Sequence, residues 1–130
     1  MKGIENGRAA YAYNCVEQAK TKRDVKNKEY KAYCKRIPMM IKTNGLAGTI
    51  AFVKTKKDNK AYGLLYRQLS EWLAGEDRNW LLPDFGPNQE LIGHLVRLDS
   101  TSYRAVTVEV LALFQWLRHL ADGLLGEENN

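Results

Sequence analysis

The chain has 130 residues, with 20 Lys and Arg, 15 Asp and Glu, and a formal net charge of +5. This length is typical of one domain and allows a real hydrophobic core. No apolar run is long enough to span a membrane, and no charged-then-apolar leader opens the chain. We therefore expect a cytoplasmic protein with no membrane partner.

The distribution of charge is more informative than its total. Residues 1–60 hold 15 Lys and Arg against 5 Asp and Glu, whereas residues 61–130 hold 5 against 10. A protein with a basic half and an acidic half can bind a polyanion with one side. It can also stack on copies of itself, basic side to acidic side.

Helical spacing predicts a first helix from about Ile4 to Lys22, with small and apolar residues along its inner side. A basic run from Lys20 to Lys28 follows, and we expect it to form the turn before the second helix.

The segment from Tyr30 to Lys57 carries the strongest pattern in the chain. Its first apolar residues share one helical face, at Tyr30, Tyr33, Cys34, Ile37 and Ile41. Pro38 lacks a backbone N–H, so the helix is expected to bend or restart there. Asn44-Gly45 predicts a second break, where the backbone turns left-handed. After it, helical spacing returns at Leu46, Ile50 and Val53.

Four lysines form a row on another face of the same predicted helix: Lys28, Lys31, Lys35 and Lys42. At about 100° per residue this row lies roughly 130° around the helix from the apolar face. A mild bend at Pro38 keeps Lys42 in the row, whereas a true break does not. The row is either a solvated helix face or a surface that binds anions, and the sequence leaves both interpretations open.

The chain then alternates between turns and helices. A polar turn at 56–60 precedes an amphipathic helix from Tyr62 to Leu73, for which Gly75 is the predicted left-handed stop. Residues 76–88 form the longest irregular stretch. Its apolar residues, at Trp80-Leu81-Leu82-Pro83 and Phe85, are predicted to lie on the core, with partner docking as the alternative.

A short helix opening at Pro87 or Asn88 should carry Leu91, Leu95 and Leu98. Ser100-Thr101-Ser102 is the predicted cap of a last helix, which runs to Leu124 and is apolar enough to lie near the centre of the bundle. Residues 125–130 are interpreted as a polar tail. The sequence thus predicts one all-α domain over residues 1–130, a compact bundle of about five to seven helices with no sheet.

No catalytic set stands out. His119 lies three residues before Asp122 and His94 five before Asp99, but two such residues do not make a metal or general-base site. No phosphate-binding loop or nucleophile elbow is present. Cys15 and Cys34 lie in helical patterns without a neighbouring histidine, so we expect buried free thiols. We predict that the protein is not an enzyme and holds no metal or cofactor.

A family resemblance is carried by the motif Lys35-Arg36-Ile37-Pro38, followed by Met40-Ile41, Thr43-Asn44-Gly45-Leu46-Ala47 and Ile50-Ala51-Phe52. These residues, and the order of later features at Tyr62, Trp72-Leu73, Tyr103-Arg104 and Trp116-Leu117-Arg118, closely resemble the small helical subunit of the type III-B CRISPR effector, the Cmr complex. The likeness covers nearly the whole chain.

The resemblance implies an all-helical, non-catalytic subunit in antiviral defence. Its copies would stack with one another and with other Cmr subunits, in a minor filament along the duplex of guide RNA and target RNA. Base pairing would carry the specificity, so this subunit needs only cationic groups against phosphates. The candidate RNA-binding residues are Lys35, Arg36, Lys42, Asn44, Lys54, Arg104 and Arg118. Of these, Lys42 and Lys54 rest on charge geometry alone, and the two late arginines are equally suited to ion pairs.

Two other functions remain to be compared. In a protein–protein adaptor, the basic half would only meet the acidic half of the next copy, without direct RNA contact. A helix-turn-helix DNA binder is disfavoured because the segment from Leu46 to Val53 is too apolar for a recognition helix.

Overall fold

Helices account for nearly all secondary structure in residues 4–86 and 88–126, which are the residues that the computed structural model of the chain describes. The α-helices are α1 (Ile4–Thr21), α2 (Asn27–Asn44), α3 (Leu46–Thr55), α4 (Lys60–Leu73), α5 (Leu91–Val96) and α6 (Ser100–Leu124), with one 3-10 turn, η1 (Glu76–Arg78). No strand occurs in this part of the chain. The prediction of an all-α bundle of five to seven helices is confirmed.

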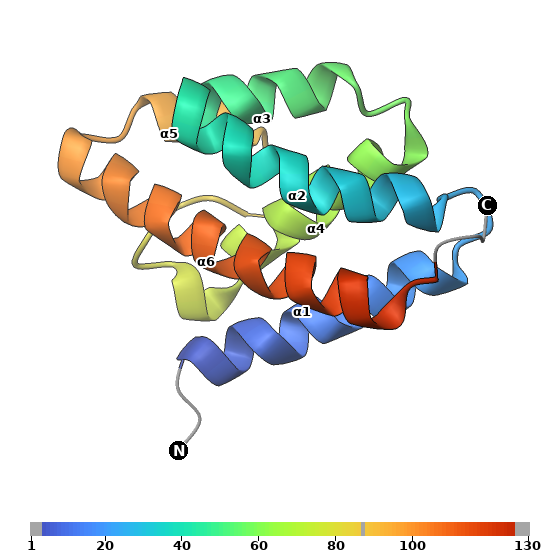
Figure 1. Cartoon of the computed structure of the whole chain (residues 1–130). Coiled ribbons are helices and arrows are strands. Elements are labelled where there is room, and N and C mark those ends of the chain that lie inside the picture. Colours follow the sequence, from blue (N-terminus) through green and yellow to red (C-terminus); the bar gives the residue numbers. More distant parts are fainter. Residues whose placement is uncertain (1–3, 87, 127–130) are drawn as a thin grey trace.

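The three long helices α1, α6 and α2 lie side by side, with α4 behind them and α3 above (Figure 1). Their apolar faces meet in a single core cluster. α6 buries Val106, Val110, Leu113 and Leu117 completely, as its sequence pattern predicts. Leu120 and Leu124 are only half-buried, so the last turns of α6 are enclosed on one side rather than all round.

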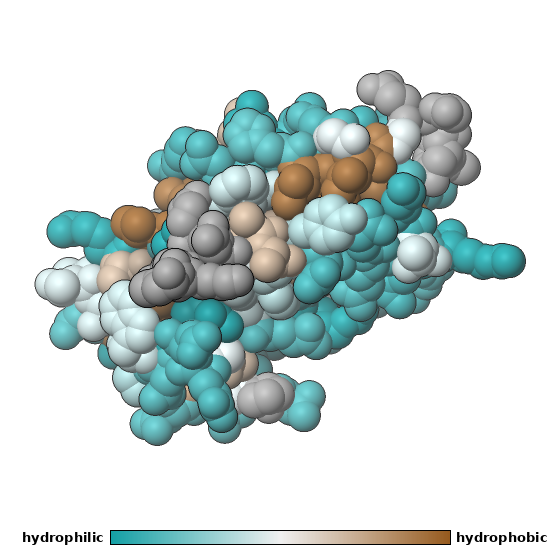
Figure 2. Space-filling model, turned by 90° about the horizontal axis from the view of Figure 1, so that it is seen from below, coloured by the Kyte–Doolittle hydropathy of each residue, from teal (hydrophilic) through white to brown (hydrophobic). Residues whose placement is uncertain are grey.

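Seen from the α1 side, the surface is mainly hydrophilic, with a broad apolar patch toward one end and smaller apolar areas toward the other (Figure 2). None of the described helices combines the length and the apolarity that a membrane span requires. Cys15 and Cys34 are buried and free, in agreement with the sequence-based expectation.

α2 runs through Pro38 as one continuous helix, so Lys42 stays in the same helix as Lys35. The apolar stripe of α2 is buried as predicted, apart from the half-buried Tyr33. At Gly45 the chain turns with a φ of +86°, which confirms the predicted break. The Gly45 N–H closes α2 by donating to the Ile41 carbonyl at 2.8 Å.

Two predicted helix ends are wrong in detail. Gly75 has a φ of −67°, so it is not a left-handed stop. Glycine at this position leaves room for the side chain of Arg78, because a Cβ on residue 75 would overlap its guanidinium. The Arg78 guanidinium carbon in turn lies 3.6 Å from the centre of the Trp72 ring. The cap of α6 is Asp99 rather than Ser100–Ser102, since its Oδ1 accepts the Ser102 N–H at 2.7 Å. This bond lowers the pKa of the Asp99 carboxyl.

The stretch between α4 and α5 packs on the core through Leu81, Leu82 and Phe85, as predicted, but Trp80 is 65 % exposed. α5 begins at Leu91, later than the predicted start at Pro87 or Asn88, and Pro87 itself lies outside the described residues. Within the predicted polar tail Leu125 is buried, because its apolar side chain joins the core. Residues 127–130 of that tail also lie outside the described part.

Candidate nucleic-acid interface

The outward face of α2 carries most of the residues that the sequence singles out. Four of the seven candidate residues, Lys35, Arg36, Lys42 and Asn44, are on this helix, and all four are exposed. The buried stripe on the opposite side, from Tyr30 to Ile41, fixes the rotation of α2 and thereby turns these four outward.

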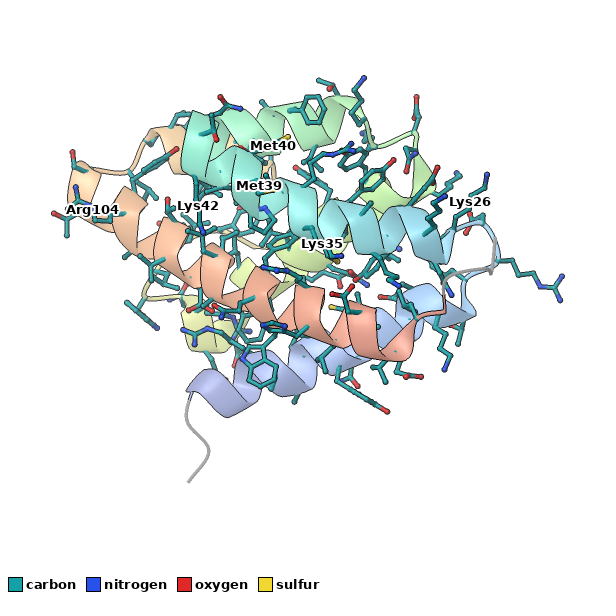
Figure 3. The ribbon with its side chains drawn as sticks, in the orientation of Figure 1. Lys26, Lys35, Met39, Met40, Lys42 and Arg104 are labelled. Atoms are coloured by element: carbon teal, nitrogen blue, oxygen red, sulfur yellow. The ribbon has the colours of Figure 1, made fainter. Side chains whose placement is uncertain are left out.

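The lysine row follows the edge of α2 that borders α6. The Nζ of Lys35 lies 3.5 Å from Oδ1 of Asp122 on α6, and both side chains are about half exposed, at 50 % and 45 %. An exposed pair of this kind contributes only about 0.5 kcal/mol to stability, and an incoming phosphate can displace its carboxylate. Lys42 lies two turns further along the same edge (Figure 3).

Arg36 is held on the other edge of the same face by two tyrosines. Its Nη1 donates a hydrogen bond to the Tyr62 hydroxyl at 3.2 Å, and its guanidinium carbon lies 5.4 Å from the centre of the Tyr33 ring. The two rings stack nearly parallel, with centroids 3.7 Å apart. The bond to Tyr62 raises the pKa of Arg36, so its positive charge is kept and its direction is set.

A shallow groove of about 430 Å³ lies between these edges. It is lined by Lys35, Arg36 and Asn44 and by two methionines, of which Met39 is 67 % exposed (Figure 3). Two cations, an amide and flexible thioether side chains therefore share one open surface. Such a surface suits a phosphate backbone, and the methionines can adapt to apolar sugar or base edges.

The other three candidates lie elsewhere. Lys54 on α3 pairs with Glu90 at 3.5 Å, so its charge is already partly offset within the chain. Arg104 and Arg118 are exposed on α6, and fourteen residues of helix put them about 21 Å apart. Neither lines the α2 groove, and Figure 3 places Arg104 at the far end of α6 from Lys35.

Sequence reasoning missed the aromatic support under Arg36 and the exposure of Met39. The sequence places Tyr33 on the apolar stripe of α2, and Tyr62 belongs to another helix, so their stacking depends on the tertiary fold. A signal for Met39 was present, because it falls between the lysine row and Arg36 on the helical wheel rather than on the apolar stripe.

His94 takes part in local packing, whereas His119 is exposed. The ring Nδ1 of His94 lies 3.1 Å from the Glu90 carbonyl oxygen, and its ring meets Phe85 edge to face at 5.1 Å. His119 lines a small hollow on α6 beside Trp116. Within residues 4–86 and 88–126, no three His, Cys, Asp or Glu side chains are grouped closely enough to hold a metal ion.

Comparisons with known proteins support the family resemblance over nearly the whole chain. The model of the CRISPR-associated protein family Cas_Cmr5 matches residues 4–124. The CRISPR system Cmr subunit Cmr5 of Thermotoga maritima is 34 % identical over 131 residues, covering 100 % of this chain and 91 % of that protein. The crystal structure of a CRISPR-associated Cmr5 family protein from Thermus thermophilus has the same fold, with a TM-score of 0.77, 23 % identity, and coverage of 97 % and 100 % of the two chains. The chain therefore belongs to the Cmr5 family of CRISPR-associated proteins.

Proposed function

We propose that this chain is a non-catalytic structural subunit of an RNA-guided type III-B CRISPR ribonucleoprotein. In this role it acts in the cytoplasm, stacks with copies of itself and with other Cmr subunits, and holds the backbone of guide and target RNA. Membership of the Cmr5 family supports assembly with other Cmr subunits, since the relative from Thermotoga maritima is described as a Cmr subunit.

The proposed RNA contact rests on the outward face of α2. Lys35, Arg36 and Asn44 line one open groove, with Lys42 along its edge, while the buried stripe of the same helix holds them in place. Cations spread along one rigid helix meet successive phosphates without reading bases. This is what a subunit needs when pairing with the guide supplies the specificity.

The test compares RNA retention by the assembled complex at several salt concentrations. A triple variant, Lys35→Ala with Arg36→Ala and Lys42→Ala, is set against a triple control at exposed cations off this face, Arg23→Ala with Lys56→Ala and Arg97→Ala. Both lose the same charge. We expect the α2 variant to bind RNA more weakly, with a salt slope lower by about 2 to 3, and without a change in sequence preference.

The competing adaptor function gives a different result in the same experiment. If the α2 variant assembles normally and retains RNA as well as the control does at every salt concentration, the phosphate contacts are refuted. If assembly is lost while the RNA affinity of the isolated chain is unchanged, the basic half serves to stack copies together.

A further inference from the structure

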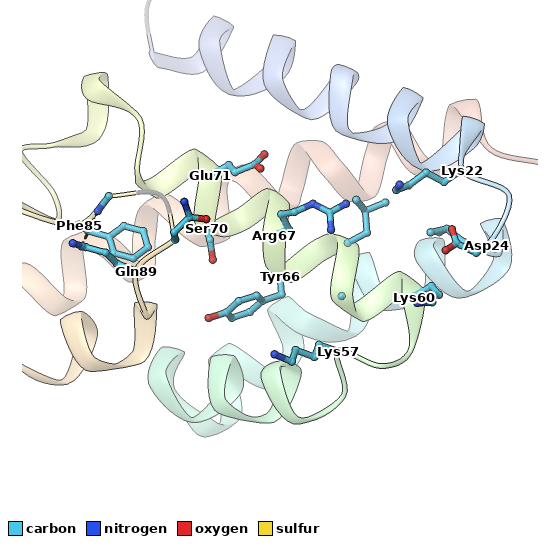
Figure 4. A pocket seen from close by; sticks show the side chains of 15 residues that line it. Lys22, Asp24, Lys57, Lys60, Tyr66, Arg67, Ser70, Glu71, Phe85 and Gln89 are labelled. Carbon is cyan, nitrogen blue, oxygen red and sulfur yellow. Dashed lines mark hydrogen bonds between the residues drawn. The ribbon is translucent and has the colours of Figure 1, made fainter.

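We propose that the face of α4 turned away from α2 and α6 holds a second, separate site, which binds a nucleoside phosphate. The pocket there has a volume of about 490 Å³, within the usual range for small-ligand sites. Figure 4 shows its position between the turn after α1, the end of α3, and the loop that precedes α5. It shares no residue with the α2 groove.

Four cations surround this pocket, namely Lys22, Lys57, Lys60 and Arg67, against two carboxylates, Asp24 and Glu71. They come from three separate parts of the chain, and the fold alone brings them together (Figure 4). Among the described residues none of the four forms an ion pair. A cluster of unpaired cations with a surplus of two positive charges favours an anion of comparable charge, such as a phosphate monoester.

Apolar and aromatic side chains form part of the pocket lining. Leu64 and Phe85 are buried there, and the half-buried Tyr66 extends between Lys57 and the loop of Phe85 and Gln89 (Figure 4). Inorganic phosphate or sulfate would leave this apolar surface unused. A planar base stacked on Tyr66 would cover it and keep its phosphate at the cationic rim.

Polar groups suited to a base edge are already held in position. The loop before α5 is closed by two hydrogen bonds, in which the Gly86 N–H donates to Gln89 Oε1 at 3.0 Å and the Gln89 N–H donates to the Gly86 carbonyl at 3.2 Å. With its oxygen engaged, the Gln89 amide presents N–H donors. The Ser70 Oγ on the α4 side is buried and has no hydrogen-bond partner within the described residues, so the exposed Gln89 amide is the polar group that a base edge can reach. An amide donor beside an aromatic ring favours a nucleotide over an acidic peptide.

A free nucleotide and one nucleotide of an RNA strand present the same base and phosphate groups to the pocket. The following experiment distinguishes these two sources. The 14.9 kDa chain is titrated by NMR with nucleoside monophosphates, an eight-nucleotide RNA, inorganic phosphate and a glutamate-rich peptide. The amides of Gly63, Ser70 and Gly86 report on the pocket. The Lys35→Ala, Arg36→Ala, Lys42→Ala background is used, so that failure of the α2 face and failure of this pocket are distinguished.

We expect a monophosphate to shift these three amides and to bind about tenfold more weakly after Tyr66→Leu or Arg67→Gln. The matched controls Tyr66→Phe and Arg97→Gln should bind within twofold of the parent. Tighter binding of the RNA than of the monophosphate identifies a strand as the source, and binding of the monophosphate alone identifies a free nucleotide.

Three results would overturn the proposal. The first is that inorganic phosphate matches the affinity of the nucleotide and Tyr66→Leu has no effect, which would reduce the pocket to an ion site. The second is that the acidic peptide shifts the pocket amides where no nucleotide does. The third is the absence of any shift at these amides with all four ligands.

Discussion

Arg8 forms a bidentate pair with the buried carboxylate of Glu109, through its Nε at 3.0 Å and its Nη2 at 2.9 Å. The same carboxylate accepts the Trp72 Nε1–H at 2.8 Å. Because these residues belong to α1, α6 and α4, one carboxylate joins three helices on the inner side of the bundle.

Replacing Glu109 with alanine should destabilise the fold by about 3 kcal/mol, since it removes the buried carboxylate that accepts from the Arg8 guanidinium and from the Trp72 indole N–H. For a domain of this size the melting temperature should fall by roughly 10 °C. Urea denaturation checks the free energy, and Glu76→Ala, at an exposed acid in η1, is the control, with less than about 0.5 kcal/mol expected. Equal stability of the two variants would show that the Glu109 network contributes little.

The corner between α2 and α3 allows a prediction at Gly45. Its φ of +86° is rarely adopted by residues with a side chain, so Gly45→Ala should destabilise the protein by about 1 to 2 kcal/mol. Gly123→Ala is the matched control, because Gly123 lies inside α6 and a methyl group added there would meet nothing within 4 Å. That change should stabilise by about 0.5 to 1 kcal/mol. Thermal unfolding of the two variants measures both, and shifts of the same sign would contradict the assignment.

Tyr103 should stabilise the same corner between α2 and α3. Its hydroxyl accepts the Ala47 N–H at 2.8 Å and so satisfies a free donor in the first turn of α3. Tyr103→Phe should cost about 1 kcal/mol in unfolding free energy and should expose the Ala47 amide to faster hydrogen exchange. Tyr13→Phe, at an exposed tyrosine of α1, should change neither quantity. Unchanged exchange at Ala47 would mean that water replaces the hydroxyl without loss.

The sequence was most predictive where one helix buries one face. The spacing of Tyr30, Cys34, Ile37 and Ile41 was enough to orient α2, and the Asn44-Gly45 pair marked its end. Contacts between distant parts of the chain could not be predicted from the sequence, because local periodicity carries no information on them. Arg8 and Glu109 are 101 residues apart. The pairing of Lys54 with Glu90 and the place of Tyr62 beneath Arg36 have the same origin.

Burial should make the two cysteines unreactive in the native state. It raises the pKa of Cys15 to about 12 and that of Cys34 well above its ordinary value. At pH 9 about one Cys15 in a thousand is then a thiolate, so disulfide-exchange reagents should label it only on unfolding. Labelling time courses with and without urea check this, and rapid labelling of the folded chain would contradict the burial.

The same pKa shifts make stability depend on pH. An unfolded thiol ionises near pH 8.5, whereas the folded thiols keep their protons, so the stabilising effect is full below about pH 8.5 and is lost as the pH rises toward the folded pKa. Unfolding free energies between pH 7.5 and 9.5 should therefore fall with pH. A Cys15→Ala, Cys34→Ala variant should show a flatter profile, and identical slopes would remove the thiols as the cause.

Single substitutions should rank the candidate RNA contacts. Arg36→Ala and Lys42→Ala should each lower the salt slope of RNA binding by about 1, because each removes an exposed cation from the α2 face. Lys54→Ala should have a smaller effect, since Glu90 already offsets its charge at 3.5 Å. Glu90→Gln supplies the converse variant: releasing Lys54 from its carboxylate should strengthen RNA binding if the strand passes α3, and should leave it unchanged if RNA contacts only α2. A larger loss from Lys54→Ala than from Arg36→Ala would move the RNA path from α2 to α3.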